Sequence, residues 1–199
     1  RRSASCQGRS EVRRADQSRL AVEERAAPIF DADGKLTGGV MVLRDVSLSR
    51  EIDQRRSREA THDPLTEIFN RREFENRVRL ALAELQASGQ TQVVCYMDLD
   101  GFKVVNDTCG HAVGDRLLVQ LAQLIRSHIR ESDTLARLGG DEFGALLVGC
   151  DLERARVIAS ELIAAIDEYV FVSDGKRFSV GISIGLTRIS ADHAGITEI

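Results

Sequence analysis

The sequence contains no tryptophan, and only two of its 199 residues are proline. This low proline content, without any long biased tract, argues against an intrinsically disordered chain. No apolar run approaches the roughly 18 residues that a membrane helix requires, and no segment has the pattern of a signal peptide. We therefore expect a cytoplasmic fragment without a membrane segment. Because the chain begins at Arg1, this expectation does not extend to a membrane anchor elsewhere in a parent protein.

The sequence also lacks an excess of positive charge and a cysteine spacing typical of metal sites or disulfides. The formal net charge is −4, which gives no support to binding of a nucleic acid polymer but leaves room for a small basic nucleotide pocket. The four cysteines, Cys6, Cys95, Cys109 and Cys150, follow no Cys-x-x-Cys or Cys/His spacing. A zinc site or a disulfide framework is therefore not expected, and the cysteines fit small thiols in a reducing compartment.

The composition that remains is typical of a globular protein. Hydrophobic residues make up 43% of the chain and charged residues 29%. The length allows one ordinary domain and a part of another.

An antiparallel hairpin is predicted near the N-terminus. Residues 19–30 partly alternate, the turn Asp31–Lys35 contains Gly34, and residues 36–44 are a mostly apolar run. The sequence PIFDADGKLTGGVMVLRDVS resembles the last two strands of a PAS sensor domain, which commonly end in a D-[VI]-[ST] motif. The resemblance implies that residues 1–46 are the C-terminal part of such a domain, whose ligand pocket lies largely upstream.

Residues 47–62 are rich in helix-forming and charged residues and contain neither glycine nor proline. Their apolar side chains are too few for an independent core. We expect a connecting signalling helix, either alone or paired with a copy of itself.

Periodic patterns after this helix predict an α+β domain. Asp63-Pro64 suits the start of a helix. Helical spacing of apolar residues follows, alternating with strand-like runs and ending in an alternating strand; the helices are expected at 72–88, 116–130 and 151–169, and the strands at 92–97, at 134–148 as a hairpin, and at 178–189. The order is that of the ferredoxin-like βαββαβ fold (split βαβ) with a central antiparallel sheet.

Two groups of acids are expected to meet at the ends of the central strands. Asp98 and Asp100 follow the first strand, and Gly139-Gly140-Asp141-Glu142 forms the hairpin turn. Glycine permits the positive φ of a tight turn and lets a phosphate approach the backbone. Carboxylates with a partly open shell suit magnesium held together with substrate phosphates.

A second group lies between residues 102 and 115. Asn106 and Asp115 can face a base, since a carboxylate accepts from the N1–H and exocyclic amine of guanine, a donor pair that adenine lacks. Lys103 offers a cation for phosphate charge. His111 fits equally a substrate contact or a structural histidine that fixes the loop between two glycines.

Four blocks of sequence together resemble the GGDEF domain, the diguanylate cyclase fold. They occur in the family's order, and the region that they span is about two thirds of the chain: DPLTEIFNRREF (63–74), DLDGFKVVNDTCGHAVGD (98–115), RESDTLARLGGDEF (130–143) and SVGISIG (179–185). The resemblance implies a GGDEF, nucleotide cyclase-like domain over residues 63–199.

The resemblance implies a two-magnesium phosphoryl transfer, with manganese as an alternative ion. Each domain of a homodimer binds one GTP, and the two are joined into cyclic di-GMP with release of two pyrophosphates. Asp98 and Asp141 would hold the metal ions with the Leu99 carbonyl, and Asp141 or Glu142 would help deprotonate the attacking hydroxyl. Lys103 would stabilise the transition state.

The remaining implied roles concern substrate and product. Asn106 and Asp115 would bind guanine, His111 would contact substrate, and the Gly139–Gly140 backbone would admit the phosphates. Arg130 and Asp133 fit the RxxD spacing of the family's inhibitory site for cyclic di-GMP.

The chain departs from the family pattern at three places. Glu67-Ile68 replaces a usual Gly-Leu, and Cys109 replaces a usual aromatic residue. The family's last helix, with a Y-x-x-A-K-x-x-G-R-N signature, is not found before Ile199, so the domain is expected to be truncated before that helix.

Three functions fit these observations to different degrees. The first is a diguanylate cyclase regulated by an upstream PAS domain and by its product. The second is a regulatory module that binds GTP or cyclic di-GMP and controls a downstream EAL phosphodiesterase. The third, a dimerisation module with a relict site, predicts lost acids, and the core acids are all present.

Overall fold

The computed structural model describes residues 6–13, 15–17, 19–88 and 91–190. The chain divides into two compact units, Arg1–Arg58 and Glu59–Ile199. The domain was predicted to be truncated before the family's last helix. This prediction concerns the end of the chain, which lies outside the described residues. No described helix is both long and apolar enough to span a membrane.

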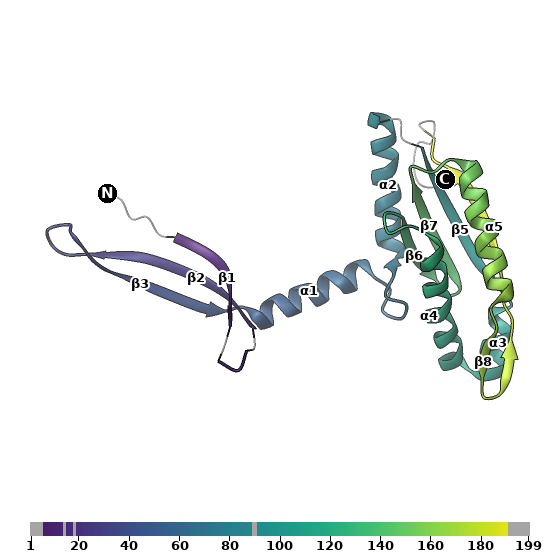
Figure 1. The fold of residues 1–199 in the computed structure, drawn as a ribbon, viewed down its shortest axis with the longest axis horizontal. Helices are drawn as coiled ribbons and strands as arrows, with labels where there is room; N and C mark the ends of the chain where they lie inside the picture. Colours follow the sequence, from purple (N-terminus) through teal and green to yellow (C-terminus); the bar gives the residue numbers. More distant parts are fainter. Residues whose placement is uncertain (1–5, 14, 18, 89–90, 191–199) are drawn as a thin grey trace. The chain divides into compact units, whose positions relative to one another are not determined.

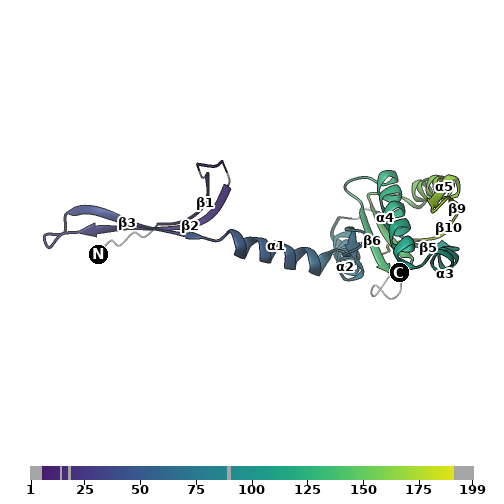
Figure 2. The ribbon, with the colours of Figure 1, turned by 90° about the horizontal axis from the view of Figure 1, so that it is seen from below.

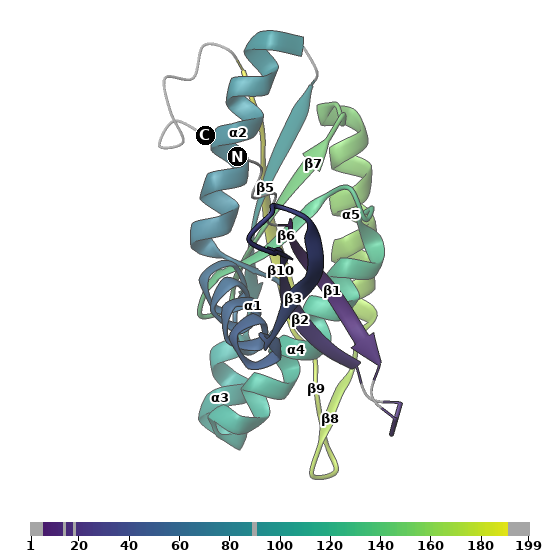
Figure 3. The same ribbon diagram turned by 90° about the vertical axis from the view of Figure 1, so that its left-hand side faces the viewer.

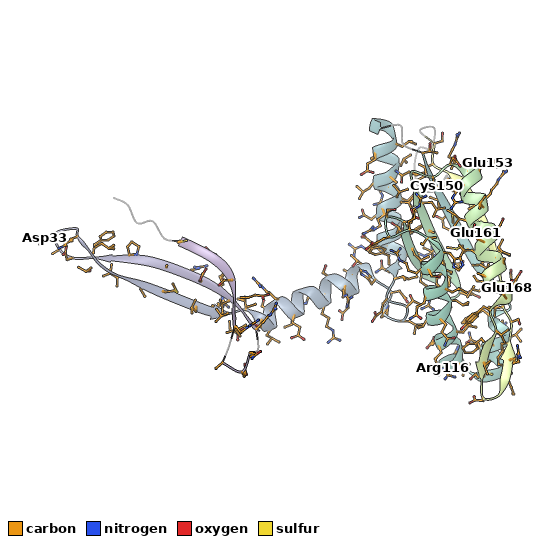
Figure 4. All side chains as sticks on the ribbon, in the orientation of Figure 1. Asp33, Arg116, Cys150, Glu153, Glu161 and Glu168 are labelled. Atoms are coloured by element: carbon orange, nitrogen blue, oxygen red, sulfur yellow. The ribbon has the colours of Figure 1, made fainter. Side chains whose placement is uncertain are left out.

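The first unit contains a three-stranded antiparallel sheet in the order β1-β2-β3, formed by β1 (Cys6–Arg13), β2 (Arg19–Phe30) and β3 (Leu36–Asp45). The predicted hairpin of β2 and β3 is confirmed, whereas β1 was not predicted. The turn of the hairpin has Gly34 at φ 79°, and the Asp31 carboxylate accepts from the amides of Asp33 and Lys35. Asp33 marks this turn in Figure 4.

The predicted connecting helix is present as α1 (Ser47–Thr61). The amide of Ser47 donates to the Asp45 carboxylate at 2.9 Å, which fixes the entry into the helix. The apolar side chains Leu48 and Ile52 are 69% and 42% exposed. The helix therefore has little packing of its own.

The second unit has a five-stranded sheet in the order β10-β5-β7-β6-β4. Its strands are β4 (Phe69–Asn70), β5 (Gln92–Asp100), β6 (Thr134–Gly139), β7 (Glu142–Val148) and β10 (Gly181–Arg188). All neighbours are antiparallel except β4, which runs parallel to β6. The four longer strands follow the predicted βαββαβ arrangement, in which the first and third strands lie side by side in the centre.

Helices cover both faces of this sheet (Figures 1 and 2). They are α2 (Arg71–Ser88) on one face, and α4 (His111–His128) and α5 (Leu152–Glu168) on the other. Phe74 and Val78 of α2 pack on Val94 and Leu146, while the α4–α5 face contains the larger cluster, including Leu117 and Phe143. Alternation along each strand thus sends side chains into two separate cores.

The start of the first helix and the end of the first strand differ from the sequence-based prediction. Asp63-Pro64 begins a turn and not a helix; α2 begins at Arg71, and its cap is Asn70, whose Oδ1 accepts from the amide of Glu73 at 2.9 Å. The first strand does not end at Met97 but continues to Asp100. Predicted helix 151–169 is confirmed, with Asp151 as its N-cap.

Besides the short strand β4, a helix and a hairpin of the second unit were not predicted. A short helix, α3 (Phe102–Cys109), follows β5, and α4 begins at His111 where a loop was expected to continue to Gly114. A hairpin of β8 (Phe171–Ser173) and β9 (Lys176–Phe178) follows α5 and projects at one end of the unit in Figure 3. Arg116 donates to Ser173 at 2.8 Å and so ties α4 to this hairpin.

Candidate functional site

Polar residues of three neighbouring strands form a row across the sheet. Asp98 of β5 pairs with Glu142 of β7 on one side and with Ser183 of β10 on the other. Because strand side chains alternate, Tyr96, Asp98 and Asp100 are exposed on one face while Leu99 is buried on the other. The predicted convergence of Asp98 with the hairpin acids is therefore confirmed, although Asp98 lies within the strand and not after it.

The turn between β6 and β7 depends on its two glycines. Gly139 has φ 149° and Gly140 has φ 52°, values that residues other than glycine rarely adopt. Among the described residues, apart from each glycine and its two chain neighbours, no heavy atom lies within 4 Å of the position that a Cβ would take at either residue. The backbone at this turn is therefore open to an incoming group, and Asp141 follows it half-buried.

Arg137 joins this turn to the segment that precedes α2. Its guanidinium donates to the Gly140 carbonyl at 2.8 and 3.0 Å and contacts the Asp63 carboxylate at 3.3 and 3.4 Å. Asp63 also accepts from the amide and hydroxyl of Thr66. Burial raises the pKa of Asp63, but the Thr66 hydrogen bonds and the Arg137 charge outweigh it and leave the pKa below its usual range.

Arg71, at the start of α2, contacts the same strands. Its Nε donates to the Leu138 carbonyl at 2.7 Å, and its Nη2 lies 3.1 Å from Glu142 Oε2. Neither Arg71 nor Arg137 was predicted from the sequence to have a role. Both lie inside the quoted blocks, but the Leu138 partner of Arg71 and the Asp63 partner of Arg137 are 67 and 74 residues away in the sequence.

A hollow of about 540 Å³ opens over this row. It combines carboxylates, a guanidinium and an aromatic ring with an apolar floor, and its lining includes Arg71, Tyr96, Asp98, Glu142 and Ser183. Cationic and anionic groups at one surface suit a ligand that carries phosphate together with a cation.

The acids repel one another in the absence of a cation. Desolvation first, and then the charges of Asp141, Glu142 and Asp100, raise the pKa of Asp98. Within the described ranges, no three His, Cys, Asp or Glu side chains are gathered closely enough to form a complete metal site. Magnesium is commonly bound by one or two carboxylates and by substrate phosphates, so these oxygen donors fit a site that the substrate completes.

The predicted base-binding residues lie on α3 and α4. Gly101, at φ 83°, alone separates the end of β5 from α3, which brings the group near the same end of the strand as Asp98 and Asp100. Lys103, His111 and Asp115 are exposed. Asn106 is half-buried. Its Oδ1 is buried and has no hydrogen-bond partner among the residues that the structure describes.

Arg130 and Asp133 are brought together after α4. They line a hollow of about 160 Å³ with Asp151 and Arg154. Asp133 is only 6% exposed, and its carboxylate accepts from the amides of Arg130 at 2.9 Å and Val148 at 3.1 Å. This carboxylate therefore fixes the loop, a role that the sequence spacing did not indicate.

Comparisons with known proteins agree with the sequence blocks. The family model described as "Diguanylate cyclase, GGDEF domain" matches residues 60–199. The probable diguanylate cyclase DgcE of Escherichia coli K12 is 44% identical over 172 residues, which are 86% of this chain and 16% of that protein. The cyclic di-GMP phosphodiesterase PdeB of Shewanella oneidensis is 33% identical over 180 residues, 89% of this chain and 20% of that protein.

A solved structure supports the same relationship. The coiled coil and GGDEF domain of DgcB from Caulobacter crescentus, in complex with c-di-GMP, has a TM-score of 0.71 and 25% identity, covering 76% of this chain and 81% of that chain. In contrast, the chain spans a fifth or less of the length of DgcE and PdeB.

Proposed function

Since the chain belongs to the family of diguanylate cyclase GGDEF domains, we propose that it catalyses the condensation of two GTP into cyclic di-GMP and two pyrophosphates. The observation that carries this proposal is the row of Asp98 and Glu142 on adjacent strands, next to a glycine turn that presents Asp141. The turn leaves open backbone, and the hollow beside it contains Arg71. Together these groups suit a triphosphate with bound cations.

In each of the two reactions, the 3′-oxygen of one GTP attacks the α-phosphorus of the other, and pyrophosphate leaves. Asp98, Asp141 and the Leu99 carbonyl would hold two Mg²⁺ ions, or Mn²⁺, which supply charge stabilisation at the phosphates. Glu142 or Asp141 takes the proton of the attacking hydroxyl. Lys103 stabilises the negative charge that develops on the transferred group.

The α3–α4 residues select the base. Asp115 accepts from the guanine N1–H and amine, and the Nδ2 of Asn106 donates to the base. His111 contacts the substrate, and the backbone of Gly139 and Gly140 receives phosphate oxygens.

The reaction requires two copies of the chain. Each domain presents one GTP, and the acids described above form half of the reacting assembly. A homodimer brings the two halves together, and a single copy does not turn over.

The regulatory roles are further parts of the proposal. Residues 1–46 would be the end of a PAS sensor, residues 47–62 would transmit its signal, and residues 63–199 would catalyse. Arg130 would bind product through stacking and paired hydrogen bonds, with Asp133 holding its loop in place.

Arg130→Ala is expected to abolish binding of micromolar cyclic di-GMP, whereas Arg156→Ala on the exposed face of α5 retains it. Unchanged binding in Arg130→Ala would contradict this site.

A second function is favoured by the similarity to PdeB, a phosphodiesterase. In that case the domain binds GTP or cyclic di-GMP and controls a downstream EAL phosphodiesterase without forming product.

The two functions are separated by one assay. The full-length protein is supplied with GTP and Mg²⁺, and the wild type is compared with Asp141→Asn and Glu142→Gln. The cyclase predicts cyclic di-GMP from the wild type and a loss of at least ~100-fold in both variants. Glu161→Gln, on the exposed face of α5 (Figure 4), is the control that retains activity. GTP binding without product in the wild type supports the regulatory module.

A further inference from the structure

The amide of Asn106 lies against a glycine of the next helix. A Cβ built on Gly114 of α4 would lie 1.9 Å from Asn106 Oδ1 and 2.9 Å from its Cγ. The nearest other atom is Phe102 Cζ at 3.2 Å, a distance that a small shift of the ring relieves. The Asn106 amide therefore occupies the space that any side chain at residue 114 would need.

The backbone gives no separate reason for glycine at this position. Gly114 lies in the first turn of α4 and is not among the residues with positive φ. Alanine forms helices more readily than glycine, so local helix stability alone would favour alanine here. The contact that distinguishes the two residues is the one with Asn106.

Fixing one atom of an amide fixes the other. The oxygen and nitrogen lie on opposite sides of Cγ, so an oxygen held against Gly114 sets the direction in which Nδ2 donates. Oδ1 has no hydrogen-bond partner in the described part of the chain, and it lies in the space that a Cβ at residue 114 would fill.

We propose that Gly114 is a positioning residue for guanine recognition, acting through the Asn106 side chain. The inference rests on the proposed role of Asn106 as a base-binding residue. Any side chain at residue 114 turns the amide away from the base and reduces the preference for guanine over adenine.

The test measures binding of 3′-deoxy-GTP and 3′-deoxy-ATP to the full-length protein, since neither analogue has the attacking hydroxyl. Gly114→Ala is expected to weaken binding of the guanine nucleotide about tenfold, the effect of losing one hydrogen bond to the base. Binding of the adenine nucleotide changes little. Asn106→Ala has the same effect, and the double variant binds no more weakly than Asn106→Ala alone. Ala112→Gly, exposed in the same turn, is the matched control.

The outcomes separate this inference from the proposed function. If Asn106→Ala lowers guanine preference and Gly114→Ala retains it, the positioning role is wrong and the cyclase proposal stands. If Asn106→Ala itself leaves the preference unchanged, the assignment of Asn106 fails, and this inference fails with it. An equal loss for both nucleotides in Gly114→Ala shows a structural role only and overturns the inference.

Folding provides a second measurement. Without the Asn106 side chain, the main obstacle to a Cβ is gone, and alanine then favours the helix. The midpoint of thermal unfolding should therefore fall when Gly114→Ala is introduced into the wild type and stay level or rise when it is introduced into Asn106→Ala. Should Gly114→Ala alone not fold, recovery in the double variant supports the contact, and failure of both contradicts it.

Discussion

Arg137 connects three parts of the second unit through one guanidinium. It contacts the Gly140 carbonyl, the Asp63 carboxylate and, through Asp63, the Thr66 turn. The side chains of Arg137 and Asp63 are only 14% and 18% exposed. Removing one partner of a pair this well shielded costs more than removing one partner of a surface ion pair, because the other partner is left charged and desolvated.

Arg137→Ala is therefore expected to lower the free energy of unfolding by about 2 kcal/mol. It also releases the glycine turn, and a displacement of catalytic acids by about 1 Å costs ~100-fold in activity. Denaturant unfolding and the cyclic di-GMP assay check both effects. Arg156→Ala removes an exposed pair with Glu153 and should change stability by less than about 0.5 kcal/mol. Equal effects of the two substitutions would contradict this account.

The lowered pKa of Asp63 predicts a dependence of stability on pH. The ionised form is favoured in the folded protein, so its contribution is present above the unfolded value of 3.8 and is lost as pH falls through the lower folded pKa. Asp63→Asn should destabilise the protein at neutral pH, and the difference from the wild type should shrink at acidic pH. Unfolding free energies measured from pH 7 down to pH 3 test this, and a constant difference would exclude it.

Asp98 shows the opposite shift. Its raised pKa means that the charged form is disfavoured in the folded protein, so its ionisation weakens stability as pH rises above 3.8 unless a cation is bound. Asp98→Asn should leave stability without added cation unchanged or higher, and should reduce the rise in melting temperature that Mg²⁺ and GTP produce in the wild type. If Mg²⁺ and GTP raise the melting temperature of Asp98→Asn as much as that of Glu161→Gln, Asp98 is not a ligand of the metal.

At the scale of elements, apolar periodicity predicted most of the second unit. Leu117, Leu121 and Ile125 of α4, which follow a helical spacing in the sequence, pack in the larger core as expected. The short helix α3 was missed, because Asn106, Asp107 and Thr108 are weak helix formers. Its burial of Phe102 and Val105 against the core outweighs that propensity.

The helix start predicted at Asp63 from local capping preferences was wrong, because a residue distant in the sequence binds the Asp63 side chain. Asp63-Pro64 has the residues of a helix start, yet the Asp63 carboxylate binds Thr66 and Arg137, the latter 74 residues away. Asn70 caps α2 and also donates to the Ala60 carbonyl at 3.2 Å. The strand that carries Asp98 is longer than predicted because β7 and β10 pair with it on both sides.

Asn70→Ala is expected to destabilise the second unit by about 1 kcal/mol, the usual cost of losing an N-cap. Asp151→Ala removes the corresponding cap of α5 and should cost a similar amount, since the Asp151 carboxylate accepts a hydrogen bond from the backbone amide of Arg154 at 2.7 Å. Thermal unfolding monitored by circular dichroism compares the two. No loss in Asn70→Ala beside a clear loss in Asp151→Ala would show that the α2 cap is replaceable.

At the scale of the whole molecule, the topology explains why acids far apart in the sequence meet. The βαββαβ order places the strand of Asp98 beside the strand of Glu142, so sequence analysis could predict the meeting from the order of elements alone. The bracing by Arg71 and Arg137 could not be predicted, because it depends on side-chain reach across the folded sheet. The contribution of a second copy is part of the proposal, because each copy would present one of the two GTP molecules to be joined.

The central claim is that two copies of this site react with each other. The most direct test measures cyclic di-GMP formation per mole of full-length protein across a range of protein concentrations, with saturating GTP and Mg²⁺. Specific activity is expected to rise with protein concentration as dimers form, and an excess of Asp141→Asn chains is expected to suppress the wild type by forming mixed dimers. A specific activity that is independent of concentration and unaffected by Asp141→Asn chains would contradict it.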